Sequence, residues 1–445
     1  MIWLSGSKCQ LKILGVLTLI IFSVAPAGVF GSVQKKDVTL NAIVVVPEER
    51  WKTLFGSALE KLKERHPELN INVNYTSLPY DEARKQMLNS HDNGTNVDLY
   101  SIDQIWLGEF AKKGLLENLT RFATMWNKSS DWSENLWNGG IYNEDVYGIW
   151  AWTDVRALWY LKNVLNSTGI DPNSLGTWDG YLKAIKSLQN STLSPNAVHL
   201  VGASHSPDMW YPYLWMLGGD ILIQKEGHPE NGTYWFPGYN GTAGVKALTF
   251  LKQQIDAGVK PQQQHHWGEE FGDRKFAIML EGSWLPGDLT SNEKATFEDY
   301  VGMLPMFPVS EKGNSNATLM GGWLLGISSN SDDKDLTWEL ITTMLEPDVL
   351  LPMLKQNGYL PTQKSMMSNS TYADSLNASM PYYSELISTI PDGHIRPNIV
   401  EYPEIAAHIR GAINEVYNGT SEPKEALDKA ANQTATLLGW LKSPS

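Results

Sequence analysis

Short apolar runs alternate with longer amphipathic stretches over the first part of the chain. Apolar and β-branched residues over Val38–Val46 predict a strand, and the spacing of apolar positions from Trp51 to Arg65 predicts a helix. The alternation continues with predicted strands at Ile71–Tyr75 and Val97–Ile102 and predicted helices at Asp81–Ser90 and Ile105–Lys113. This order is typical of a parallel sheet with crossover helices, and such sheets bind ligands beyond the carboxyl ends of their strands.

The pattern changes at Tyr147–Leu161, where an aromatic, strand-like run leads into a second region of strands and helices. Further elements follow, with strands at Lys275–Leu280, Val301–Pro305 and Leu319–Ser328, and helices at Leu336–Leu345 and Val349–Gln356. The stretch from Tyr402 to Leu441 is mainly helical, with a loop at Asn418-Gly419. The fold class is therefore α/β, and 445 residues exceed what one hydrophobic core usually holds, so we expect two lobes.

Composition narrows the ligand classes. The net charge is -14, and the 35 basic residues are scattered and form no run longer than two, which argues against the basic surface that nucleic acid requires. The chain holds 18 Trp and 18 Tyr against 11 Phe. Trp and Tyr combine a flat apolar face with a hydrogen-bonding edge, and a sugar presents the complementary apolar C–H faces and hydroxyl rim.

Residues that could hold a metal or a cofactor are few. Cys9 is the only cysteine, which excludes a disulfide framework and a thiolate metal site. His265 and His266 are adjacent and would point apart on a helix, so a solvated loop is the better interpretation. The run Asp92–Asp98 faintly resembles a calcium loop. It is not followed by the glutamate required at the twelfth position, and its glycine is not at the position that such a loop requires. We expect no metal, no cofactor and no catalytic residues.

The first residues have the layout of an export segment. Lys8 and Lys12 precede an uncharged stretch from Ile13 to Gln34, and Ala25-Pro26-Ala27 lies near its end. Residues 1–37 are therefore a signal peptide or, uncut, an N-terminal membrane anchor, and both alternatives place the remainder outside the cytoplasm.

Asn-x-Ser/Thr sequons point to the same compartment. They begin at Asn74, Asn93, Asn118, Asn127, Asn166, Asn190, Asn231, Asn240, Asn316, Asn369, Asn377, Asn418 and Asn432. Dense N-glycosylation without disulfides suits an archaeal cell-surface protein.

Several longer stretches, taken in order, carry a family resemblance. They read VDLYSIDQIWLGEFAKKGLLENL (Val97–Leu119), YGIWAWTDVRALWYLKNVL (Tyr147–Leu165), TWDGYLKAIKSL (Thr177–Leu188), FGDRKFAIMLEGSW (Phe271–Trp284), GGWLLGISSNSDDKDLTWELITTML (Gly321–Leu345), and NGYLPTQKSM (Asn357–Met366) with RPNIVEYPEI (Arg396–Ile405). Over essentially the whole mature chain they resemble the ABC-importer solute-binding proteins of the maltose-binding class (family 1), most closely archaeal trehalose/maltose receptors.

The resemblance implies a two-lobed, type II periplasmic-binding-protein-like fold with a hinge and a central ligand cleft. One lobe would hold residues 38–150 plus 319–345, and the other residues 153–307 plus 352–445. The chain would cross between them near 150–154, 306–318 and 346–351. Closure of the lobes would trap the ligand.

Two aspartates are the first candidates for ligand contact. Asp103 ends the third strand and matches the family's sugar-binding aspartate, although it could instead cap the helix from Ile105. Asp154 matches an aromatic-x-Asp motif at the first crossing together with Trp152, and strand alternation places both side chains on one face. The alternative for Asp154 is a hinge residue bonded to backbone. Trp106 is interpreted as a packing residue.

Aromatic and basic candidates follow from the same resemblance. Trp284 and Trp323 match the family's stacking tryptophans, and Gly321 and Gly322 would let a sugar approach the backbone closely. Arg396 matches an arginine that reaches sugar oxygens, with an ion pair to Glu401 as the alternative. Weaker candidates are Arg84, Glu48, Glu49, Trp210, Tyr211 and Tyr402.

The sequence therefore predicts an extracellular receptor that captures a di- or small oligosaccharide and delivers it to a membrane permease. Trehalose and maltose are the leading ligands, because two tryptophans and two aspartates would flank one cleft. The resemblance also favours a small sugar over long maltodextrins, since Ala406 stands near the position where bacterial maltose-binding relatives have a further tryptophan. We expect a monomer whose partners are the sugar and the permease. A glycoside hydrolase using Asp103 and Asp154 as its two carboxylates, and a cell-surface lectin, are the alternatives.

Overall fold

The computed structural model describes residues 35–190, 198–201, 207–229, 233–259, 261–262, 276–288, 296–305, 307–310 and 316–441. Residues 1–34 of the export segment, the sequon asparagine Asn231, the His265-His266 pair and parts of the predicted crossing at 306–318 lie outside these ranges. Within the described ranges, no helix combines the length and the apolar character needed to cross a membrane.

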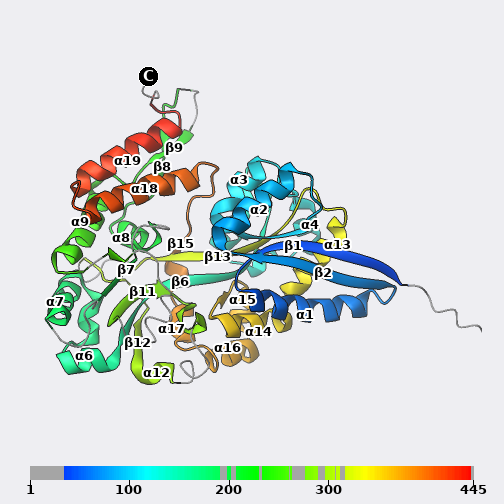
Figure 1. The fold of residues 1–445 in the computed structure, drawn as a ribbon, viewed down its shortest axis with the longest axis horizontal. Coiled ribbons are helices and arrows are strands. Elements are labelled where there is room, and N and C mark those ends of the chain that lie inside the picture. Colours follow the sequence, from blue (N-terminus) through cyan, green and yellow to red (C-terminus); the bar gives the residue numbers. More distant parts are fainter. Residues whose placement is uncertain are drawn as a thin grey trace, which may run out of the picture.

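Two α/β lobes lie at either end of one long sheet (Figure 1). The sheet has the order β10-β7-β11-β6-β13-β3-β1-β2. Its strands are β1 (Lys36–Val45), β2 (Leu69–Leu78), β3 (Leu99–Asp103), β6 (Ile149–Leu161), β7 (Val198–Val201), β10 (Pro261–Gln262), β11 (Ile278–Gly282) and β13 (Thr318–Ile327). Three short strands join it from the side, namely β12 (Val301–Leu304), β14 (Leu360–Pro361) and β15 (Gly393–His394). Two separate hairpins are formed by β4 (Ile141–Tyr142) with β5 (Asp145–Val146) and by β8 (Leu222–Glu226) with β9 (Thr233–Pro237).

Helices cover the sheet in both lobes (Figure 1). Around β1–β3 they are α1 (Glu48–Arg65), α2 (Tyr80–Asp92), α3 (Leu107–Lys112), α4 (Thr120–Trp126), α5 (Glu134–Asn138), α13 (Lys334–Met344) and α14 (Pro347–Asn357). The remaining helices are α6 (Lys162–Thr168), α7 (Trp178–Gln189), α8 (Tyr211–Met216), α9 (Thr242–Asp256), α12 (Phe297–Tyr300), α15 (Lys364–Ser368), α16 (Ser370–Asn377), α17 (Tyr383–Ile387), α18 (Tyr402–Tyr417) and α19 (Pro423–Leu437).

The predicted alternation at the start of the chain is confirmed. β1 pairs in parallel with both β2 and β3, and parallel neighbours require crossovers, which α1 and α2 supply. One predicted helix, Ile105–Lys113, is divided into a 3-10 turn, η1 (Gln104–Trp106), followed by α3. The carboxyl ends of β1, β2 and β3 consequently lie together at the edge that faces the second lobe (Figure 1).

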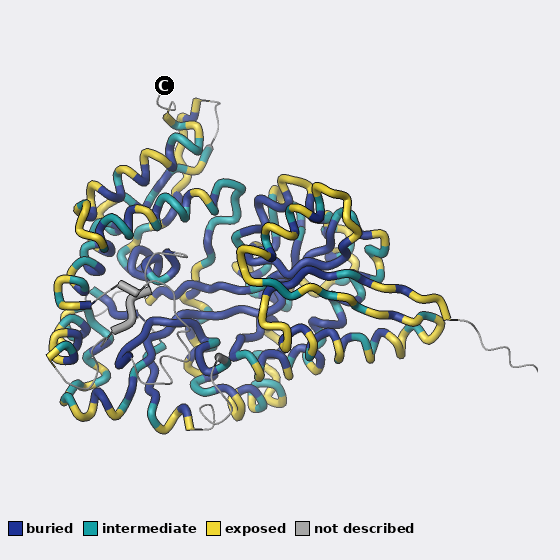
Figure 2. Tube along the Cα trace, viewed as in Figure 1, coloured by how far each residue is buried: buried dark blue, intermediate teal, exposed yellow. Residues whose placement is uncertain are grey.

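One strand, β6, belongs to both lobes. Its first half, Ile149–Val155, pairs with β13, and its second half, Arg156–Leu161, pairs with β11 and β12. All of its residues are buried except Tyr160, which is half-buried. Figure 2 shows this buried strand running through the centre while exposed residues gather on the outer helices. We propose that the chain first crosses between the lobes where the pairing partner changes, next to the predicted position 150–154.

A close approach between backbone and side chains fixes the middle of β6 against β13. The indole Nε1 of Trp150 donates to the carbonyl oxygen of Trp152 at 2.9 Å, and Gly322 of β13 lies against both. A Cβ atom on Gly322 would lie 2.1 Å from that indole nitrogen and 2.4 Å from that carbonyl oxygen. Gly322 also has a φ of 149°, which side chains rarely adopt.

We predict that Gly322→Ala lowers the free energy of unfolding by about 1–3 kcal/mol, as overpacking of a buried site does. Gly56→Ala is the matched control, because Gly56 lies in the exposed interior of α1 with open space around it, where alanine favours the helix. Urea unfolding of both variants measures the difference. A Gly322→Ala midpoint equal to that of the unmodified protein would contradict the steric argument.

Candidate functional site

Asp103 lies at the carboxyl end of β3, at the edge of the sheet that faces the second lobe. Its Oδ1 accepts a hydrogen bond from the backbone N–H of Ile105 at 3.3 Å, so it does cap the turn that follows. Its Oδ2 accepts from the hydroxyl of Tyr80, at the start of α2, at 2.7 Å. Capping uses one oxygen of Asp103, which leaves the carboxylate free to make further contacts.

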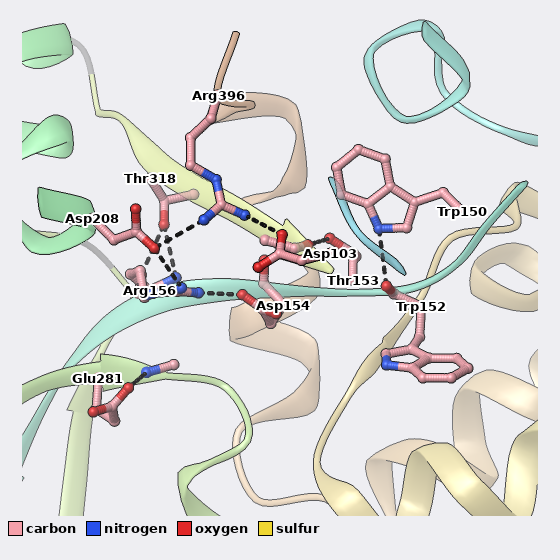
Figure 3. A network of polar contacts seen from close by, with 12 residues as sticks. Asp103, Trp150, Trp152, Thr153, Asp154, Arg156, Asp208, Glu281, Thr318 and Arg396 are labelled. Atoms are coloured by element: carbon pink, nitrogen blue, oxygen red, sulfur yellow. Dashed lines mark hydrogen bonds and ion pairs between the residues drawn. The ribbon is translucent and has the colours of Figure 1, made fainter. Parts of the chain in front are cut away.

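Arg396 reaches this carboxylate from the segment that precedes α18 (Figure 3). Its Nη2 donates to Oδ1 of Asp103 at 3.1 Å, and its Nη1 donates to Oδ2 of Asp208 at 3.1 Å. The predicted alternative, an ion pair between Arg396 and Glu401, is wrong. Among the described residues, Arg396 forms ion pairs with Asp103 and Asp208. Asp208 lies in a 3-10 turn, η4 (Pro207–Met209), just before α8. The bridge therefore joins three segments that are far apart in sequence.

The network continues onto β6 (Figure 3). Arg156 pairs with Asp154, two residues earlier on the strand, and its Nη2 lies 3.7 Å from Oδ2 of Asp208. Asp103, Arg396, Asp208, Arg156 and Asp154 thus form a chain of alternating charge, and each of the five is at most 9% exposed. Buried charges are tolerated only when they are paired, and here every carboxylate has an arginine.

The protonation behaviour follows from burial and pairing. Burial raises the pKa of Asp154, while Arg156 and Arg396 lower it, and the net direction is upward. Burial also acts to lower the pKa of Arg396, but Asp208 and Asp103 outweigh it, so the net pKa is raised and the guanidinium stays charged. Burial and the neighbouring Asp103 raise the pKa of Tyr80, which keeps its hydroxyl a hydrogen-bond donor.

Aromatic rings flank the network on the side of the first lobe. Trp323 of β13 lies directly opposite Asp103 in the strand register and is partly exposed. The ring centroids of Tyr80 and Trp106 are 4.6 Å apart, and each lies 6.3 Å from that of Trp323. Trp106 is buried, in agreement with its interpretation as a packing residue. Trp323 and Tyr80 therefore both retain an accessible face, since Trp323 is partly exposed and Tyr80 is exposed.

Trp284 flanks the network on the other side. It follows β11, is partly exposed, and lies under the guanidinium of Arg156, whose Cζ is 4.5 Å from the ring centroid. Its centroid is 6.4 Å from that of Tyr359. The Arg156 contact is a cation–π interaction that links Trp284 to the charged network.

The two glycines of β13 have a different role from the one expected. A Cβ atom on Gly321 would lie 2.6 Å from Oδ1 of Asp154, and one on Gly322 would clash with Trp150. The space that a sugar was expected to use is occupied by side chains of β6. These glycines therefore allow Asp154 and Trp150 to pack against the backbone of β13.

Some weaker candidates lie away from the network. Glu48 and Glu49 are exposed, and Glu49 lies 3.8 Å from Lys52, which is likewise exposed. Arg84 is half-buried and pairs with Glu109 of α3, which is buried. Glu48 and Glu49 thus face solvent, and Arg84 is held by a carboxylate outside the network.

The remaining candidates are buried. Trp152 is fully buried, with its ring centroid 5.5 Å from that of Trp51. Trp210 is 1% exposed, and the hydroxyls of Tyr211 and Tyr402 lie 3.0 Å apart. Burial raises the pKa of Tyr211, the interactions with Tyr402 and Asp208 raise it further, and Arg396 lowers it. The tyrosine pair therefore lies close to the charged network.

Sequence reasoning missed residues on which the site depends: Tyr80, Arg156, Asp208, Tyr359 and Arg50. Arg156 alternates with Asp154 on β6, so the period of a strand could have found it. Asp208 gives no such signal, because only the tertiary fold brings η4 to β6.

The network itself is closed to solvent. A cavity of about 470 Å³ is lined by Ser283, Gly287, Asp299, Lys355, Gly358 and Asn377–Pro381 among others, and its lining includes none of the five network residues. No group of His, Cys, Asp and Glu within the described ranges could hold a metal ion. The arrangement presents carboxylate and guanidinium groups between aromatic rings, and such groups can recognise hydroxyls.

Comparisons with known proteins identify several similar chains. A family model described as bacterial extracellular solute-binding protein matches residues 57–378. A Brucella abortus protein described as a binding protein is 24% identical over 395 residues, covering 86% of this chain and 90% of its own. The galactooligosaccharide-binding protein of Bacillus subtilis is 21% identical and covers 98% of both chains. The solved GacH receptor of Streptomyces glaucescens is 22% identical, covers 91% of this chain and 98% of its own, and superposes with a TM-score of 0.76.

We predict that Asp208→Asn lowers the free energy of unfolding by about 3–5 kcal/mol, because breaking a buried ion pair leaves an uncompensated charge. Asp208 is the carboxylate that lies between Arg396 and Arg156. Asp335→Asn is the control, since Asp335 and its partner Arg121 are both largely exposed at 3.8 Å. Urea unfolding should separate the two variants. Equal midpoints would show that the network contributes no more than a surface pair.

Proposed function

This chain belongs to the bacterial extracellular solute-binding proteins, and we propose that it captures a small oligosaccharide and delivers it to an ABC-type permease. One observation carries the proposal: buried carboxylates and accessible tryptophan rings converge where the two lobes meet. Asp103 and Asp154 supply acceptors for hydroxyl hydrogens, and Trp284 and Trp323 supply flat faces for the C–H surface of a sugar.

The names of similar proteins support a carbohydrate ligand. The Bacillus subtilis relative is a galactooligosaccharide-binding protein, and the GacH receptor was solved in complex with acarbose. Both ligands are oligosaccharides. Trehalose and maltose remain our leading candidates, on the resemblance of the motifs around Asp103, Asp154 and Arg396.

Transport rather than catalysis is favoured by how the carboxylates are held. Glycoside hydrolysis needs one carboxyl group that gives up a proton and a second that acts as base or nucleophile. Asp103 is paired with Arg396 and Asp154 with Arg156, so each carboxylate is already engaged in an ion pair. The relatives reported above are binding proteins and receptors.

The family is extracellular, and we propose that residues 1–37 export or anchor the chain so that it works as a monomer beside its permease. The described sequon asparagines support glycosylation at the surface, since all are exposed except Asn240. Asn240 is half-buried and donates from its amide to Asp428 at 2.9 Å. We therefore propose that Asn240 is the sequon least suited to carry a glycan.

We predict that a panel of di- and trisaccharides raises the melting temperature of the purified protein, because a ligand that binds only the folded state stabilises it. Amino acids, peptides and polyamines at the same concentration serve as negative controls. The proposal of a sugar receptor fails if these raise the melting temperature and no sugar does. Recovering the bound sugar intact after incubation separates a receptor from a hydrolase.

We predict that Trp284→Ala weakens binding of the sugar found in that panel by about 2–4 kcal/mol, the range for truncating a central aromatic anchor. Trp235→Ala is the matched control, because Trp235 is an exposed tryptophan of the β8–β9 hairpin. Isothermal titration calorimetry measures both affinities. If a folded Trp284→Ala variant keeps its affinity, Trp284 is a packing residue and the binding surface lies elsewhere.

A further inference from the structure

Arg50 is a buried cation at the start of α1. It is the third residue of this 18-residue helix and only 4% exposed. Its Nη2 donates to the hydroxyl of Tyr359 at 2.9 Å, and its Cζ lies 4.7 Å from the centroid of the Tyr359 ring. Its Nε and Nη1 are buried and have no hydrogen-bond partner among the described residues.

No carboxylate of the described residues forms an ion pair with this charge. None of the ion pairs between described residues includes Arg50, whereas the other two buried arginines of the site, Arg156 and Arg396, each contact two aspartates. Its sequence neighbours Glu48 and Glu49 are exposed to solvent. A guanidinium is charged at every physiological pH, and burying it without an anion costs several kcal/mol. Within the described ranges, Arg50 therefore has no anionic partner.

A second unpartnered donor lies beside it. The ring of Trp152 has its centroid 5.9 Å from Cζ of Arg50, and its Nε1 is fully buried without a hydrogen-bond partner among the described residues. Figure 3 shows this ring on the opposite side of β6 from Arg396. The amino end of α1 adds its own partial positive charge at Arg50. Three features that favour an anion thus meet at one place.

A series of ring contacts connects this place to the carboxylate network. Arg156 lies over Trp284, the Trp284 and Tyr359 rings are 6.4 Å apart, and Tyr359 holds Arg50. These contacts therefore join two chemically different ends. The end around Asp103 and Asp154 accepts hydroxyl hydrogens and repels anions, and the Arg50 end attracts them.

We propose that the sugar captured by this protein carries an anionic group, a uronate carboxylate or a phosphate, which binds to Nε and Nη1 of Arg50 and Nε1 of Trp152. The proposal rests on the proposed function and names the class of its ligand. The anion binds at the Arg50 end while the neutral hydroxyls bind at the aspartates, which fixes the direction in which the sugar lies.

Matched pairs of ligands test this proposal by calorimetry at fixed ionic strength. One pair is digalacturonate with the neutral disaccharide of the same linkage, and the other is trehalose 6-phosphate with trehalose. We expect the anionic member of one pair to bind roughly tenfold or more tightly than its neutral partner, the lower end of what a charge-assisted hydrogen bond contributes. The pair that shows the difference distinguishes a uronate from a phosphate.

Variants of the helix terminus identify the residue. Arg50→Gln should abolish the preference for the anionic member and leave the affinity for the neutral member within about twofold. Arg50→Lys keeps the positive charge and should retain part of the preference for the anionic member. Lys52→Gln is the matched control, because it removes a cation from the same turn at an exposed position. In addition, Arg50→Met should raise the urea midpoint of the ligand-free protein, because it removes an uncompensated buried charge.

Each failure has a distinct meaning. If neutral sugars bind as tightly as their anionic partners and Arg50→Gln weakens both equally, Arg50 is a hydroxyl donor, and the inference is overturned while the sugar receptor stands. If Arg50→Met lowers the ligand-free midpoint, the guanidinium is already compensated within the chain and the inference is also overturned. If no carbohydrate of either kind binds, the proposed function itself fails, and the inference fails with it.

Discussion

Five ionised side chains are buried where the two lobes meet, and the structure at this junction depends on their mutual neutralisation. Removing a charged group from water costs several kcal/mol, which only close pairing recovers. Arg396 provides that pairing for Asp103 of β3 and Asp208 of η4, and Arg156 provides it for Asp154. Because these residues come from four different segments, the charge balance holds the relative positions of β3, β6, η4 and the segment before α18.

β6 provides the backbone on which this balance is built. A strand that pairs with β13 over its first half and with β11 over its second half runs through both lobes without interruption. Asp154 and Arg156 stand on either side of the point where the partner changes. Gly321 allows the carboxylate of Asp154 to lie against β13, since any side chain at that position would displace it. The close strand pairing and the buried charges are therefore consequences of the same local packing.

Sequence patterns predicted the elements well and the partners poorly, for a physical reason. Strand and helix periodicity is local, so β1 to β3, β6 and β13 were found within a few residues of their observed ends. Ion pairs are tertiary. Glu401 was a reasonable local partner for Arg396, but the chain turns at Arg396 so that its guanidinium faces β3 instead. Likewise the sequence favoured Glu48 and Glu49 at the start of α1, whereas the helix turns them to solvent and buries Arg50.

The closed network also limits which molecules can bind between the lobes. Arg396 bridges Asp103 and Asp208, and the atoms of this bridge are buried, so a ligand that takes their place must supply replacement hydrogen bonds to ionised groups. Under the proposed function, each sugar hydroxyl would both donate to a carboxylate and accept from a guanidinium, whereas an apolar molecule could do neither. The C–H faces of the sugar would then lie against Trp284 and Trp323. The alternation of charge that stabilises the ligand-free junction would in this way also favour a hydroxylated ligand.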